Sequence, residues 1–226
     1  MTKTNFIKFI QEKAGYFGIT GVTATSTTVI VAFYLYTSVD PTFNTISNCV
    51  SDLGTGPNMS NIIYNIGAVI TGLCQISLYS GLIKYLQNEN GNPYLIKITR
   101  LTFMISAIGL IILGFIPFER GIQFFYFGHG SAAAIHYVTA SIAFICYGIF
   151  ELLILKFSKI LGVISFLTGI IYSSLWVGYL IDYTVKLPKV YMNYSLQWIS
   201  LAGILFWSLV HSIFLILTKK RNSENA

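Results

Sequence analysis

The chain has 226 residues, of which 54% are hydrophobic and only 10% charged, and its formal net charge is +6. Soluble domains carry about 25% charged residues. The composition therefore excludes a soluble enzyme, a nucleic-acid-binding module, a disulfide scaffold and a disordered tail. Apolar runs of about 17–25 residues are long enough to cross a bilayer as helices, so the sequence predicts a multi-pass membrane protein.

Six apolar runs follow one another along the chain, over residues 17–36, 62–82, 101–117, 131–155, 160–181 and 196–217. We interpret each as a membrane-spanning helix, because an unclosed sheet would leave backbone groups unpaired in lipid. The predicted fold is an all-α integral membrane bundle with one domain over residues 17–218. An N-terminal segment, 1–16, precedes this domain, and a basic tail, 219–226, follows it.

Lys and Arg residues are distributed unequally between the two sides of the predicted bundle. Of the 14 in the chain, 11 lie in or beside the N-terminal segment, the second and fourth connections and the tail. The other three, Arg120, Lys186 and Lys189, lie in the odd-numbered connections. Cytoplasmic connections are enriched in Lys and Arg. We therefore expect both termini in the cytoplasm and the protein in the plasma membrane.

The first exterior connection contains a turn-forming run with Ser51, Asp52 and Gly54. Ser60 or Asn61 is expected to cap the helix that follows. Free amide groups at the start of a helix can bind phosphate, so one interpretation is a lipid headgroup or anion site. The alternative is a loop that only caps and orients that helix.

The second exterior connection ends with one histidine, His129, between two glycines, and His136 follows two helical turns later on the same face. An imidazole can act there as an acid or base or as a metal ligand. A catalytic zinc site needs three protein ligands, yet the chain has no His-Glu-x-x-His or His-x-x-x-His motif and no cysteine pair. No cofactor is predicted, zinc is left open, and a hydrogen-bonded interfacial histidine is the alternative.

Other polar residues lie inside the apolar runs. Glu151 is close enough to a helix end to reach the interface or to pair with Lys156. His211 is interpreted as a packing histidine beside Trp207. Three amide side chains are expected to form hydrogen bonds between helices: Asn65, Gln75 and Gln197.

Several short motifs occur in a definite order: Ser51-Asp52-Leu53-Gly54, Asn65-Ile66-Gly67, a glycine-containing run over residues 109–117, and His129. In this order and spacing the chain resembles a family of membrane proteins grouped as domain of unknown function 998. The resemblance covers most of the chain. The layout is also similar to the Frag/DRAM/Sfk group of six-helix proteins, some of which are linked to lipid handling, and this implies a role that involves lipids.

These observations give three hypotheses. The first is a protein that binds or modifies lipid at the extracytoplasmic leaflet, with Asp52 and His129 as anchors or a catalytic acid–base pair. The other residues of this predicted site are Ser51, Gly54, Asn61, Asn65 and His136. If the protein is an enzyme, it is expected to be a lipid-modifying hydrolase or transferase. The alternatives are a structural or adaptor subunit and a carrier for a small solute. Expected partners are membrane lipid and a second copy or another membrane protein, but no nucleic acid.

Overall fold

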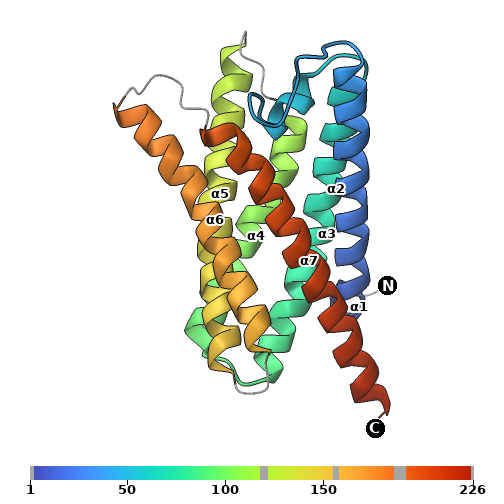
Figure 1. Cartoon of the computed structure of the whole chain (residues 1–226). Helices are drawn as coiled ribbons and strands as arrows, with labels where there is room; N and C mark the ends of the chain where they lie inside the picture. The colour runs from blue at the N-terminus through green and yellow to red at the C-terminus, as the bar shows by residue number, and fades with distance from the viewer. Residues whose placement is uncertain (1–2, 118–121, 155–157, 186–191, 225–226) are drawn as a thin grey trace.

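The computed structural model describes residues 3–117, 122–154, 158–185 and 192–224. Within these ranges, six helices are long and apolar enough to cross a membrane (Figure 1). They are α2 (Ala14–Thr37), α3 (Ser60–Asn88), α4 (Pro93–Phe115), α5 (Gln123–Leu153), α6 (Lys159–Val185) and α7 (Met192–Glu224). The prediction of an all-α fold with six membrane-spanning helices is confirmed.

Most helix ends extend beyond the apolar runs that predicted them, although α4 and α5 each end two residues before their runs do. The clearest case is α4, which begins at Pro93 although its apolar run begins at residue 101. The side chain of Asn92 accepts hydrogen bonds from the backbone N–H groups of Tyr94 and Leu95, and proline suits the first helical position. Long charged side chains near a helix end can reach water, so hydropathy falls before the helix ends. For the same reason α7 continues through most of the predicted basic tail.

The start of α3 differs from the prediction. The residue before the helix is Met59, in the left-handed backbone region at φ 64°, and it forms no side-chain cap. A backbone turn takes the place of a side-chain cap, because the N–H of Ser60 donates to the carbonyl oxygen of Pro57 over 3.1 Å. The expectation that Ser60 or Asn61 caps this helix is therefore wrong. Asn61 lies in its first turn.

The six spanning helices form a closed ring. Each packs against its neighbours in sequence, and α2 packs against α7. Small residues allow close approach: a Cβ atom on Gly67 of α3 would lie 2.0 Å from Thr28 Oγ1 of α2. One on Gly148 of α5 would lie 2.6 Å from the backbone nitrogen of Phe166 in α6. Glycine at these positions therefore sets the helix spacing, as is common in membrane bundles.

The two ends of the ring are built differently (Figure 1). We call the end that holds both chain termini the terminal end; it also holds the short helix α1 (Lys3–Glu12). At the opposite end, a loop with the 3-10 helix η1 (Val50–Thr55), which we call the cap, packs against α2, α3 and α7. The cap is packed onto the bundle, since Leu53 is fully buried and the indole N–H of Trp198 in α7 donates to the carbonyl oxygen of Asn48 over 2.9 Å.

All Lys and Arg residues within the described ranges lie at the terminal end, where α3 and α5 end and α4 and α6 begin. The cations of the odd-numbered connections, Arg120, Lys186 and Lys189, lie outside the described residues, as does Lys156. A cytoplasmic position for the terminal end stays a prediction from the positive-inside rule.

Aromatic side chains fill the interior of the ring between its middle and its terminal end. Tyr79 of α3 stacks on Phe103 of α4 with ring centroids 4.0 Å apart. Phe144 of α5 packs edge-on against Trp207 of α7 at 4.8 Å, and Tyr147 packs against Trp207 at 6.0 Å. These five fully buried residues form what we call the aromatic layer.

Candidate functional site

The residues of the predicted outer site lie in the cap and at the adjoining start of α3. Asp52, in η1, accepts a hydrogen bond from the backbone N–H of Cys49 over 2.8 Å through its Oδ2 atom. The amide of Asn65 donates to the carbonyl oxygen of Gly54 over 3.0 Å. Ser51 is half-buried beside Asp52. Asp52 and Asn65 therefore hold the shape of the cap, whatever else they do.

His129 lies at the same end of the molecule, in the first turns of α5. Its Nδ1 atom is 2.7 Å from the carbonyl oxygen of Ile116. Because a carbonyl oxygen only accepts, Nδ1 carries the hydrogen. An electrostatic interaction links the Asp52 carboxylate to this histidine. The structure thus brings Asp52 and His129 to one end, while their catalytic or lipid-binding role stays a prediction.

His136 belongs to a different place, halfway along α5. Its Nδ1 atom is 2.9 Å from the carbonyl oxygen of Ser106 and 3.1 Å from the hydroxyl of that residue. By the same argument Nδ1 donates to the carbonyl, so Nε2 of the neutral ring has a free lone pair. Among the described residues, no side chain or backbone group donates to that atom. His136 lines a cavity in the centre of the ring.

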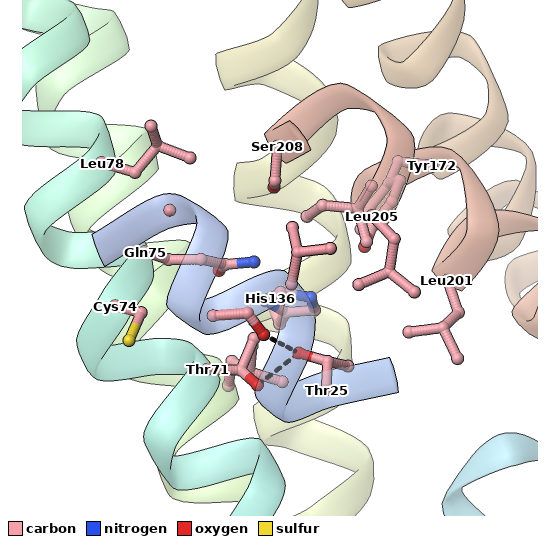
Figure 2. Close-up of a pocket in the computed structure, with 15 residues that line it drawn as sticks. Thr25, Thr71, Cys74, Gln75, Leu78, His136, Tyr172, Leu201, Leu205 and Ser208 are labelled. Carbon is pink, nitrogen blue, oxygen red and sulfur yellow. Dashed lines mark hydrogen bonds between the residues drawn. The ribbon is translucent and has the colours of Figure 1, made fainter. Parts of the chain in front are cut away.

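This central cavity has a volume of about 60 Å³, and all six spanning helices line it (Figure 2). Its polar lining comes from Thr25 of α2, Thr71 and Gln75 of α3, His136 of α5, Tyr172 of α6 and Ser208 of α7. The remaining lining residues are apolar or small. None of the fifteen lining residues is Asp, Glu, Lys or Arg. The cavity is therefore mainly apolar, with a few polar groups, and it carries no formal charge when His136 is neutral.

Gln75 is the outstanding residue of the central cavity. Its side chain is only 5% exposed, and its Oε1 atom is buried without a hydrogen-bond partner among the described residues. Figure 2 shows its amide directed into the interior of the ring, toward the space that Ser208 also faces. The expectation that Gln75 forms a hydrogen bond between helices is wrong. Buried polar atoms are nearly always satisfied. Several other buried side-chain atoms also form no hydrogen bond with the described residues, but Gln75 is the member of this group that lines the central cavity.

Two hydroxyl groups complete one wall of the central cavity. Thr25 Oγ1 and Thr71 Oγ1 are 2.6 Å apart. Each also lies within hydrogen-bond distance of the carbonyl oxygen four residues earlier in its own helix, at 2.7 Å for Thr25 and 2.6 Å for Thr71. These two side chains satisfy each other, in contrast to Gln75.

The described residues contain no group of three or more His, Cys, Asp and Glu side chains that could hold a metal ion. The zinc alternative for His129 thus gains no further ligands from this part of the chain.

One known family matches the sequence, described as "Protein of unknown function (DUF998)", over residues 21–218. The chain belongs to the DUF998 family. The matched segment runs from α2 into α7 and contains every polar residue of the central cavity. No curated protein and no solved structure matches the chain.

A second polar region of this DUF998 protein lies toward the terminal end and shares Trp207 with the aromatic layer. It contains Glu151, which is fully buried and bonded to His211 and Ser165. The expectation that Glu151 reaches the interface or pairs locally is wrong. The packing of His211 beside Trp207 is confirmed, with ring centroids 4.3 Å apart. No motif indicated that Glu151 and His211 meet, because they are 60 residues apart.

Proposed function

We propose that this DUF998 protein is a membrane carrier for a small uncharged polar solute, which binds in the central cavity. The observation that carries this proposal is the buried Gln75 amide, which forms no hydrogen bond with the described residues and faces the cavity. A bound solute supplies an acceptor for the amide nitrogen, which Figure 2 shows directed into the cavity. A buried polar group left unsatisfied destabilises a protein by about 1–3 kcal/mol, and an apolar residue at this position would avoid that.

The size of the central cavity limits the solute. A water molecule needs at least about 10–15 Å³ of such volume, and the cavity has about 60 Å³. At about 15 Å³ for each water molecule, it therefore has room for about four. This is enough for a small amide or a short polyol and too little for a lipid headgroup with its chains.

The chemistry of the lining indicates which solutes fit. No charged side chain lines the cavity to balance an ion, and burying an uncompensated ion is strongly unfavourable. The Nε2 lone pair of His136 accepts a hydrogen bond, and the Gln75 amide both donates and accepts. A small amide such as urea carries N–H donors for the imidazole and a carbonyl oxygen for the Gln75 amide.

The lipid and adaptor hypotheses predict different behaviour. A lipid site at Asp52 and His129 predicts a bound lipid in native mass spectra of the gently released protein, and its loss in His129→Ala. An adaptor predicts a crosslinked partner in native membranes. Neither hypothesis explains the unsatisfied amide in the centre of the ring, and for that reason we favour the carrier.

Solute flux into proteoliposomes tests the proposal. Stopped-flow light scattering is recorded for urea, acetamide and glycerol with the wild type, Gln75→Leu and empty vesicles. We expect faster entry of at least one solute with the wild type and a return to the empty-vesicle rate in Gln75→Leu.

Gln197→Leu is the matched control. Gln197 is a half-buried glutamine of α7 whose Oε1 also forms no hydrogen bond with the described residues, but it does not line the central cavity. Its replacement is expected to leave the flux unchanged. Wild-type vesicles that admit all three solutes no faster than empty ones would overturn the proposal.

A further inference from the structure

Four fully buried side chains from three helices form one hydrogen-bonded group near the terminal end. We call it the Glu151 cluster: Glu151 of α5, Ser165 of α6, and Trp207 and His211 of α7. Glu151 Oε1 is 2.8 Å from His211 Nε2, and the hydroxyl of Ser165 donates to Glu151 Oε2. The indole N–H of Trp207 donates to Ser165 Oγ over 2.7 Å. Every pair among these three helices is joined by a side-chain hydrogen bond.

The donors and acceptors of the Glu151 cluster fix the number of its protons. His211 Nδ1 is 2.8 Å from the carbonyl oxygen of Trp207, which only accepts, so Nδ1 carries a hydrogen. The Trp207 N–H occupies one lone pair of Ser165 Oγ, which is also 3.3 Å from His211 Nε2, and the Ser165 hydrogen is directed at Glu151 Oε2. The contact between Oε1 and Nε2 therefore needs one further proton, shared by the carboxylate and the imidazole.

With that proton the Glu151–His211 pair has no net charge, and without it the pair carries one negative charge. The titratable groups around it give little compensation. Tyr147 of α5 interacts electrostatically with Glu151, and Tyr79 of α3 contacts Trp207. From α4, the residue that packs against Trp207 is Phe103, which carries no charge. Lys159 of α6 donates to the carbonyl oxygens of Leu152 and Ile154 instead.

We propose that the Glu151 cluster is a proton-binding site and that the ring closes as seen here only while the shared proton is bound. On release, the proton leaves the Oε1···Nε2 contact for water at the terminal end and the pair becomes a carboxylate and a neutral imidazole. Closing three helices around that unpaired charge is strongly unfavourable. On rebinding, the imidazole Nε2–H bond forms again and the charge is removed.

The Glu151 cluster is placed to link this proton to the central cavity. Ser208 lines the cavity and His211 belongs to the cluster, and they are three residues apart on α7, or about 4.5 Å along the helix axis. If the protein is the carrier proposed above, it takes up its solute together with a proton. This part of the proposal rests on the proposed function.

The proton site is tested without any solute. In a Trp176→Phe, Trp198→Phe background, Trp207 is the remaining tryptophan, and it stacks on His211. A protonated imidazole quenches indole fluorescence, so we expect the emission to rise as the pH is raised and the proton leaves. Over the same range the melting temperature of the detergent-solubilised protein should fall by roughly 5–10 °C.

Glu151→Gln is the matched variant, since its amide can donate to His211 Nε2 and accept from Ser165 but has no exchangeable carboxyl proton. We expect both pH profiles to become flat. A Gln variant that titrates like the wild type overturns the proposal. If this variant does not fold, the wild-type profiles decide, because flat wild-type profiles overturn the proposal equally.

Flux measurements separate this proposal from the previous one. An inward proton gradient should speed solute entry several-fold in the wild type and leave entry unchanged in Glu151→Gln. A Trp207 titration with no solute flux supports the proton site and contradicts the carrier. Flux through the central cavity with flat Trp207 profiles supports the carrier and overturns the proton site.

Discussion

The central cavity and the Glu151 cluster both contain polar groups buried in one ring of helices, but they differ in how their hydrogen bonds are satisfied. In the cluster, both carboxylate oxygens of Glu151 and both ring nitrogens of His211 have partners. In the central cavity, the Gln75 amide has no hydrogen bond with the described residues. The cluster is complete as a network, whereas the cavity contains an amide without a partner, which a bound solute supplies in our proposal.

This difference separates two uses of buried polarity. A satisfied network stabilises the contacts between helices, and removing one of its members destabilises the protein strongly. An unsatisfied group destabilises the empty protein and gains its partner from a ligand. Replacing a polar residue of the Glu151 cluster by an apolar one should therefore destabilise the protein. At Gln75 it should leave the stability unchanged or raise it.

The largest expected effect comes from Glu151→Ala. It leaves His211 and Ser165 without their shared acceptor, and breaking a buried ion pair costs about 3–5 kcal/mol. The measurement is the free energy of unfolding in detergent at neutral pH. Glu12→Ala is the control. That carboxylate is half-exposed in α1, so its removal should lower the free energy of unfolding only slightly. A Glu151→Ala protein as stable as the wild type would contradict the assignment of a satisfied network.

A smaller loss is expected for Ser165→Ala, which removes the acceptor of the Trp207 indole and the donor to Glu151. The expected cost is about 1–3 kcal/mol, measured in the same way. Ser174→Ala on the same helix serves for comparison, because Ser174 donates only to the carbonyl oxygen of Ile171 in its own helix. Equal effects of the two substitutions would argue against the inter-helix role of Ser165.

The smallest change, with the opposite sign, is expected for Gln75→Leu. Removing an amide without hydrogen bonds leaves stability unchanged or raises it by up to about 1 kcal/mol in the absence of solute. Thermal unfolding of solute-free protein measures this. A loss of more than about 1 kcal/mol would show that the folded protein itself satisfies the Gln75 amide.

The sequence predicts the fold well, because the length and hydropathy of a membrane span follow directly from the bilayer. The six helices, their order and their approximate centres all follow from that rule. Helix ends are predicted less well. At α4, the Asn92–Pro93 start signal lies outside the apolar run, and at α3 a backbone turn before Ser60 takes the place of the expected side-chain cap.

The polar regions were only partly predictable. Asp52, Asn65 and His129 could be assigned to one end from their position in the connections. Gln75 and Glu151 could not be placed, because lipid-facing and interior-facing sides of a membrane helix are both apolar and periodicity gives little direction. Their partners also lie on distant helices: Glu151 meets a residue 14 positions away and another 60 away.

The length of α7 has a mechanical consequence. Its 33 residues span about 50 Å, against about 30 Å for the hydrocarbon core. Along this one rod, Trp198 is attached to the cap, Ser208 faces the cavity, His211 belongs to the cluster, and Lys219 reaches the carbonyl oxygen of Glu12. The helix thus connects both ends of the bundle through contacts of its own side chains. A tilt of this rigid helix about its middle would displace the cap and the N-terminal segment in opposite directions.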